Sequence, residues 1–193
     1  MQTTERQREI IEVALDLIAS KGIQGLTIKN LSKTIGITEP AIYRHFESKT
    51  AILMALLENF REMAEMLSGL MDTFQGSAAE KIGFMFTKML GLFSETPSMV
   101  SVVFSEEIFK NDELLKNKIV EILNLHAQTI EKVIRQGQLE NNVRQDIDEK
   151  SLALLTMGSL RLLVKRWDLN NHNFNLNAEG HKLITVLEKI LGK

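Results

Sequence analysis

The stretch that decides the fold is residues 26–53, which read LTIKNLSKTIGITEPAIYRHFESKTAIL. Two short segments with helical spacing of apolar side chains, 27–35 and 38–46, are separated by a turn for which Gly36 supplies a permissive backbone. Thr38 stands where a side-chain oxygen can cap the second helix. Two short helices joined by a tight turn containing glycine predict a helix-turn-helix.

The two faces of these helices differ in chemistry, as a helix-turn-helix requires. The second helix presents small, polar or basic side chains outward, namely Pro40, Ala41, Arg44 and His45, which suit a DNA major groove. Four basic and two acidic side chains give residues 27–49 a net charge of +2, whereas the whole chain carries −2. The predicted inner face, which fixes the angle between the helices, consists of Ile28, Leu31, Ile35, Ile42 and Phe46.

Composition narrows the class of protein. The 193 residues are 44% hydrophobic, which suits a folded chain, and two prolines are few for the turns of an all-β protein. The absence of cysteine excludes disulfides, thiolate metal sites and a cysteine nucleophile. Charged residues among the first twenty argue against a secretory signal, and the longest apolar stretch, 152–164, is too short to span a membrane. We therefore expect a soluble cytoplasmic protein with no membrane partner.

Helical periodicity continues through the rest of the chain. The first helix has Thr3 or Thr4 as its cap and Gly22 at its end, and a fourth helix opens at Ser48. Residues 69–76 interrupt the pattern before further helical stretches at 78–94, 98–109, 112–138, 148–167 and 177–191. The prediction is an all-α protein of about nine helices, with a three-helix helix-turn-helix domain over residues 1–48 and a C-terminal helical bundle over residues 49–193 for ligand binding and dimerisation.

At this point the sequence resembles the tetracycline-repressor (TetR) family of bacterial transcriptional regulators. The resemblance covers about the first 55 residues and rests on Lys21-Gly22, on Leu26-Thr27-Ile28, on the run from Ile37 to Phe46, and on Ser48-Lys49. The Tyr-Arg-His-Phe sequence followed by Ser-Lys is the specific part.

The resemblance implies DNA-contacting roles for individual residues. Base edges would be met from the recognition helix, with Arg44 reading guanine O6 and N7 and Glu39 accepting from cytosine N4 or excluding wrong sequences. Phosphates would be bound by the two helix-capping threonines, by Tyr43 and His45, and by Lys49 at the start of the fourth helix. Considered alone, Tyr43 is equally well explained as a side chain that covers the edge of a small helical bundle. Each lysine, considered alone, is explained as part of a solvent-exposed helix face. The implied DNA-binding set is Thr27, Lys29, Thr38, Glu39, Pro40, Ala41, Tyr43, Arg44, His45 and Lys49.

Methionine and phenylalanine are concentrated in the C-terminal part, and the alternatives there stay open. Ordinary core packing explains them, and so does an adaptable apolar cavity, because methionine is flexible and polarisable. The resemblance implies such an effector cavity, with no basic cluster to hold an anionic head group, so we expect a lipophilic small molecule. The predicted lining is Phe60, Met63, Met66, Phe86, Met89, Phe93, Phe104 and His126, although His126 is more often a surface or core histidine.

Two strongly apolar helices near the end predict a homodimer. A monomer can bury one such helix, whereas two suggest a four-helix packing across a two-fold axis. Such a dimer places its recognition helices about 34–36 Å apart and so requires a near-palindromic operator. The predicted interface consists of Leu155, Gly158, Leu162, Leu183, Val186, Leu187 and Ile190.

Together these features predict a ligand-responsive regulator of transcription, a repressor that a lipophilic effector releases from its operator. An activator fits the sequence equally well. One rival is an architectural or cell-division factor of the same fold without small-molecule control. A helical enzyme is the remote rival, because no metalloprotease, di-iron, nucleophile-elbow or P-loop motif occurs, and Glu106 and Glu107 are adjacent and so diverge on a helix. We expect no catalytic residues, metal or cofactor.

Overall fold

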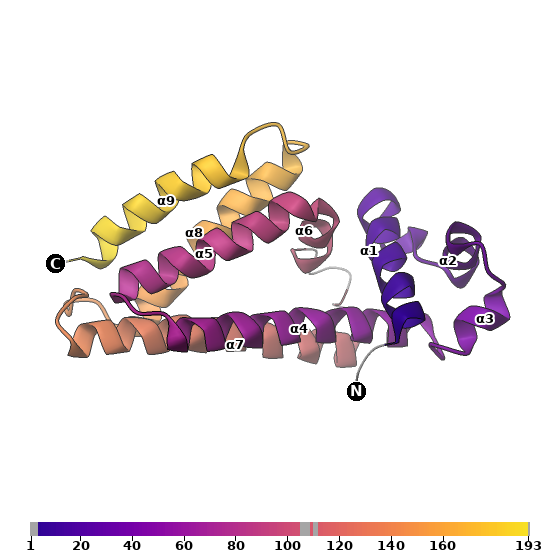
Figure 1. Cartoon of the computed structure of the whole chain (residues 1–193), viewed down its shortest axis with the longest axis horizontal. Coiled ribbons are helices and arrows are strands. Elements are labelled where there is room, and N and C mark those ends of the chain that lie inside the picture. Colours follow the sequence, from indigo (N-terminus) through magenta and orange to yellow (C-terminus); the bar gives the residue numbers. More distant parts are fainter. Residues whose placement is uncertain (1–3, 105–108, 110–111, 193) are drawn as a thin grey trace. The chain divides into compact units, whose positions relative to one another are not determined.

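The computed structural model describes residues 4–104, 109 and 112–192, and over them the chain forms nine α-helices and no strand (Figure 1). The predicted all-α fold is confirmed. The residues of the Glu106-Glu107 pair, and Thr3, lie outside the described part. The helices are α1 (Glu5–Gly25), α2 (Ile28–Ile35), α3 (Glu39–Tyr43), α4 (Lys49–Thr73), α5 (Ala78–Glu95), α6 (Pro97–Val103), α7 (Glu113–Leu139), α8 (Glu149–Leu169) and α9 (Leu176–Leu191).

The chain divides into two compact units. The first comprises residues 1–62 and 98–120, and the second comprises residues 63–97 and 121–193, so α4 and α7 contribute to both. In the first unit the Glu58 carboxylate of α4 pairs with Lys118 of α7 at 2.7 Å and with Arg61 at 2.6 Å. These bonds hold the pKa of Glu58 at about 2. The predicted domain boundary between residues 48 and 49 falls at the start of α4 and stays a prediction.

Local capping explains the helices at the start of the chain. Thr4 and Gln7 form a capping box at the start of α1, in which the side-chain oxygen of Gln7 accepts a hydrogen bond from the Thr4 backbone amide at 3.0 Å. Gly22, at φ 66°, interrupts α1 but does not end it, because a further short turn continues to Gly25. The hydroxyl of Thr27 caps α2, which ends at Gly36 in the left-handed conformation.

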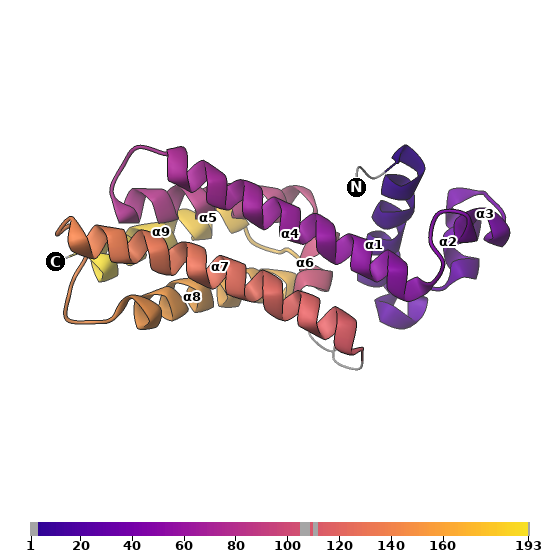
Figure 2. The ribbon, with the colours of Figure 1, turned by 90° about the horizontal axis from the view of Figure 1, so that it is seen from below.

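Helix α3 is shorter than the sequence predicted. It spans five residues, because the amides of His45 and Phe46 both bond back to the carbonyl of Ile42 and close the chain into a tight turn. Thr38 occupies the N-cap position with extended backbone, but its side chain makes no capping bond, so that part of the prediction is wrong. Helices α1, α2 and α3 lie together in the first unit (Figure 2).

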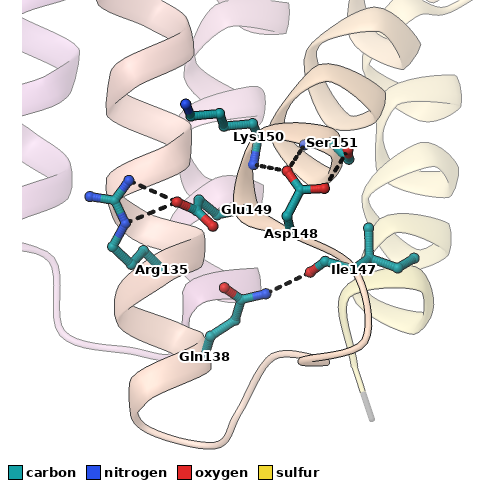
Figure 3. A network of polar contacts seen from close by, with 7 residues as sticks. All are labelled: Arg135, Gln138, Ile147, Asp148, Glu149, Lys150 and Ser151. Atoms are coloured by element: carbon teal, nitrogen blue, oxygen red, sulfur yellow. Dashed lines mark hydrogen bonds and ion pairs between the residues drawn. The ribbon is translucent and has the colours of Figure 1, made fainter.

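In the second unit α5, α8 and α9 pack side by side (Figure 1). Gly180 of α9 permits this approach, since a Cβ there would lie 2.2 Å from Cδ1 of Leu90 on α5. The turn between α7 and α8 is held by polar contacts (Figure 3): Gln138 donates to the Ile147 carbonyl at 2.8 Å, and Asp148 accepts from the first amides of α8. Among the helices described here, none has the length and apolarity of a membrane span.

Candidate nucleic-acid interface

Helix α3 is oriented by its own apolar residues. Ile42 is fully buried and Phe46 nearly so, while Glu39, Tyr43 and Arg44 are exposed. Five residues give a helix little internal hydrogen bonding, so the burial of its inner face must fix its direction. The result is a short helix whose outer side chains are free to meet another molecule.

The start of α2 adds a second polar edge in the same unit. The Thr27 hydroxyl accepts from the Asn30 amide at 3.0 Å, and the Asn30 side chain donates to the Gly25 carbonyl at 2.8 Å. Thr27 and Lys29 are both exposed. A hydroxyl that accepts one hydrogen bond still has a hydrogen to donate, so Thr27 retains the capacity to bind an acceptor such as a phosphate.

All ten residues of the predicted DNA-binding set belong to the first unit. Seven are exposed, and Ala41, His45 and Lys49 are half-buried. The side chain of Lys49 is directed into the unit, because its Nζ donates to the carbonyl of Ile23 at 2.9 Å. Burial lowers the pKa of Lys49 from its ordinary value.

Sequence reasoning missed Gln7. Its amide nitrogen donates to the carbonyl of His45 at 3.3 Å, linking the first turn of α1 to the turn that follows α3. The spacing Thr4-x-x-Gln7 is a capping-box signature that the sequence does display. The long-range bond to His45 has no local signal, since 38 residues separate the two positions.

The sequence of this chain matches two known protein families, one in each part of the chain. Residues 10–56, which contain most of α1 and all of α2 and α3, match the family described as bacterial regulatory proteins, tetR family. Residues 58–189 match the family described as YsiA-like protein, C-terminal region. The chain belongs to the TetR family. It is therefore a DNA-binding transcriptional regulator with a helix-turn-helix at its start, and the predicted family is confirmed.

Individual relatives are distant but match along most of the chain. The fatty acid metabolism regulator protein of Bacillus subtilis is 21% identical over 188 residues, covering 96% of this chain and 95% of the relative. The nucleoid occlusion factor SlmA of Glaesserella parasuis is 26% identical over 174 residues, covering 87% and 86%. The crystal structure of FadR from Bacillus subtilis in complex with stearoyl-CoA has a TM-score of 0.83 at 22% identity and covers 95% of this chain and 98% of that one. This last likeness shows the fold.

The residues predicted to line an effector cavity are distributed over both units. Phe60 and Phe104 belong to the first, and the other six belong to the second. Phe86 and Phe93 are buried, and burial lowers the pKa of the half-buried His126. Met66 is 61% exposed, so its predicted place in a cavity lining does not fit its position on the outer side of α4.

The residues predicted to form a dimer interface are mostly uncovered in the second unit. Leu155 and Leu162 of α8 are 58% and 63% exposed, Val186 and Ile190 of α9 are also exposed, Gly158 lies on the surface, and Leu183 is half-buried. Leu187 differs, because it is 4% exposed and lies in the core of its own chain. Its helical spacing from the buried Gly180 and Leu191 places it on the inner face of α9.

Proposed function

We propose that this regulator is a repressor, that it binds a near-palindromic operator as a homodimer, and that a lipophilic small molecule releases it. The observation that carries the DNA-binding part is the division of α3 into a buried face, Ile42 and Phe46, and an exposed face that includes Glu39, Tyr43 and Arg44. A rigid inner face lets the outer side chains meet base edges at a reproducible angle.

Within this proposal each exposed side chain has a role suited to its chemistry. Arg44 reads guanine through its two-pronged guanidinium, and Glu39 accepts from cytosine or excludes other bases. Pro40 and Ala41 allow close approach to the groove. Phosphates are held from the flanks, where contacts fix the register of the protein on the duplex. The proposed phosphate contacts are Thr27, Lys29, Thr38, Tyr43, His45 and Lys49.

The homodimer is supported by the uncovered apolar residues of α8 and α9. Leu155 and Leu162 are seven residues apart and so lie on one side of α8, with the exposed Gly158 between them. A Cβ at Gly158 would meet nothing within 4 Å in its own chain, which leaves that side of the helix open to another helix. A two-fold dimer formed there would present two recognition helices to one operator.

The class of effector is supported by the relatives and by side-chain chemistry. The related FadR of Bacillus subtilis was crystallised with stearoyl-CoA, a long saturated acyl thioester. Phe86, Phe93, Met85 and Met71 are buried in the second unit of this chain, and methionine adapts readily to varied apolar shapes. We therefore propose a ligand with a long acyl chain.

Selection of bound duplexes from a random library tests the DNA-binding part. We expect enriched sequences with two inverted half-sites whose centres lie about one helical turn, or a multiple of it, apart. The affinity for the enriched duplex should fall steeply with salt concentration, because phosphate contacts release counterions. Equal affinity for enriched and random duplexes at moderate ionic strength would contradict the proposal.

The effector part is tested on the protein–operator complex with a matched ligand series. Stearoyl-CoA and octanoyl-CoA differ in chain length, and free CoA controls for the head group. If the acyl chain supplies the binding energy, release of DNA and thermal stabilisation of the free protein should both rise with chain length. Equal responses to stearoyl-CoA and free CoA, or none at all, would count against an acyl ligand.

The 26% identity to a nucleoid occlusion factor gives a second candidate, a DNA-bound factor that acts in chromosome organisation without a small ligand. The two candidates differ in the number of sites occupied along a chromosome and in the response to ligand. Many dispersed sites whose occupancy no acyl ligand changes would favour the second candidate over the first.

A further inference from the structure

Helix α1 is joined at both of its ends to the segment that carries the recognition helix. In its first turn, the Gln7 amide nitrogen donates to the His45 carbonyl at 3.3 Å. In its last turn, the Ile23 carbonyl accepts from Lys49 Nζ at 2.9 Å. Gln7 and Ile23 are sixteen residues apart, and the continuous helix from Gln7 to Lys21 alone is about 21 Å long. The four-residue step from His45 to Lys49 reaches at most about 14 Å, so long side chains are needed to make both connections.

The orientation of the Gln7 side chain is set by its neighbours. Its Oε1 accepts from the backbone amide of Thr4 at 3.0 Å and from the Thr4 hydroxyl at 3.1 Å. With the oxygen so occupied, the amide nitrogen is directed away from Thr4 and toward the His45 carbonyl. That carbonyl follows a helix of only five residues, where few internal bonds restrain the backbone.

Lys49 makes the corresponding bond at the other end of α1. The carbonyl of Ile23 directly follows the non-helical Gly22, and it already accepts the Leu26 amide at 3.3 Å. Partial burial lowers the pKa of Lys49, as expected for an ammonium group drawn out of water. The ammonium is therefore directed into the unit and joins the first residue of α4 to the end of α1.

We infer that Gln7 and Lys49 are positioning residues that hold the segment from His45 to Lys49 against both ends of α1. This inference rests on the proposed DNA-binding function. For Lys49 it adds a positioning role to the phosphate contact that the family resemblance implied, because an ammonium group with one donor engaged has two more.

The inference has a specific consequence for recognition. If either bond is lost, α3 samples other tilts, and the side chain of Arg44 meets base edges less often. The exposed basic groups still reach phosphates from many tilts, because phosphate contacts carry no sequence information. The affinity for the selected duplex should therefore fall, while the affinity for random duplex should change little.

Four variants of the full-length protein separate this role from simpler ones. Gln7→Glu keeps an acceptor for the α1 cap but removes the donor to His45, whereas Thr4→Ala weakens the cap and keeps that donor. Lys49→Met removes both charge and donor, whereas Lys49→Arg keeps both. The negative charge added by Gln7→Glu weakens binding to selected and random duplexes alike. Its effect therefore cancels in the ratio of the two affinities.

We expect Gln7→Glu and Lys49→Met each to lower this ratio about threefold to tenfold, the usual effect of losing one hydrogen bond. In the free protein, hydrogen exchange at the amides of His45 and Phe46 should be faster in both variants. Lys49→Arg should leave the ratio and the exchange rates unchanged. Thr4→Ala should change both less than Gln7→Glu does, because the Thr4 backbone amide still holds the Gln7 oxygen.

The inference is overturned if Lys49→Met lowers the salt slope by about one and leaves the ratio unchanged, because that is the behaviour of a phosphate contact. It is also overturned if hydrogen exchange at His45 and Phe46 is unaffected by both variants. A wild-type protein that prefers no duplex would instead contradict the proposed function. The exchange measurement, which needs no DNA, would then still decide whether the two bonds hold the segment.

Discussion

Replacing Leu162 by alanine tests the proposed dimer most directly. The side chain is 63% exposed in its own chain and lies near the middle of α8, seven residues after Leu155. Because most of Leu162 contacts nothing within the chain, its truncation should have little effect on the folding of one protomer. A large effect must therefore come from a second copy.

The expected magnitude follows from the exposed fraction. Fully burying a leucine is worth about 1.5–3 kcal/mol, so covering the 63% left open at Leu162 is worth about 1–2 kcal/mol. A two-fold interface contains the residue twice, which doubles the loss to about 2–4 kcal/mol per dimer. The dimer dissociation constant should rise about thirtyfold to several hundredfold.

Sedimentation over a dilution series measures that constant, and Leu139→Ala is the matched control. Leu139 is also a leucine of the second unit and is 73% exposed, but it lies at the end of α7, outside the predicted interface. We expect the control to dimerise as the wild-type protein does. If Leu162→Ala dimerises as tightly as Leu139→Ala, the assignment of this face of α8 to the interface is wrong.

Three further predictions concern other sites. Arg44→Ala should weaken the binding free energy for the selected duplex by about 1–3 kcal/mol and broaden the base preference at one position of each half-site. A second selection with the variant measures this preference. If the preference is unchanged, Arg44 does not read a base. Gly180→Ala should lower the free energy of unfolding by about 1–3 kcal/mol, because its Cβ would lie 2.2 Å from Leu90. Gly91→Ala, which has open space around it, should raise the free energy of unfolding by up to about 1 kcal/mol. Urea unfolding measures both, and equal effects of the two variants would contradict the packing argument. Glu58→Gln should cost about 1 kcal/mol at pH 7, an amount reduced because the side chain is 38% exposed. Since the pKa of Glu58 is lowered from 4.5 to about 2, this stabilisation is present above pH 4.5 and lost as the pH falls toward 2. The unfolding free energies of wild type and variant should therefore converge in acid. A difference that stays constant with pH would exclude the ion pairs as its source.

The helix-turn-helix could be predicted because its determinants are local. Thr27 caps α2, and Gly36 ends it in the left-handed conformation at the turn that the sequence predicted. Ile42 and Phe46 are buried at the positions that helical spacing assigned to the inner face. Each of these features depends on residues within a few positions of one another, where propensity and capping act.

Features that depend on distant partners were beyond the sequence. The bonds from Gln7 to His45 and from Lys49 to Ile23 join positions 38 and 26 residues apart, and no spacing rule indicates them. The shortness of α3 also escaped prediction, because apolar spacing continues to Phe46 while the backbone tightens after Tyr43.

The faces of the apolar helices were the hardest to assign, and α8 shows why this matters. Periodicity cannot rank two apolar faces of one helix, since both satisfy the same spacing. In the structure, one face of α8 is buried in its own chain, and a second apolar face remains open at Leu155 and Leu162. The buried face consists of Leu152, Ala153, Thr156, Leu160, Val164 and Trp167.

The buried face of α8 includes a threonine, whereas leucines occupy the open one. For a chain that functions alone, the reverse arrangement would bury more apolar surface, because leucine gains more on burial than threonine does. The placement of Leu155 and Leu162 on the open side therefore makes sense if that side is covered in the functional assembly. The same reasoning accounts for the wrong assignment of Leu187, whose face of α9 is already filled by its own chain. The contribution of α9 to the proposed interface then rests on Val186 and Ile190, one turn apart on its exposed side.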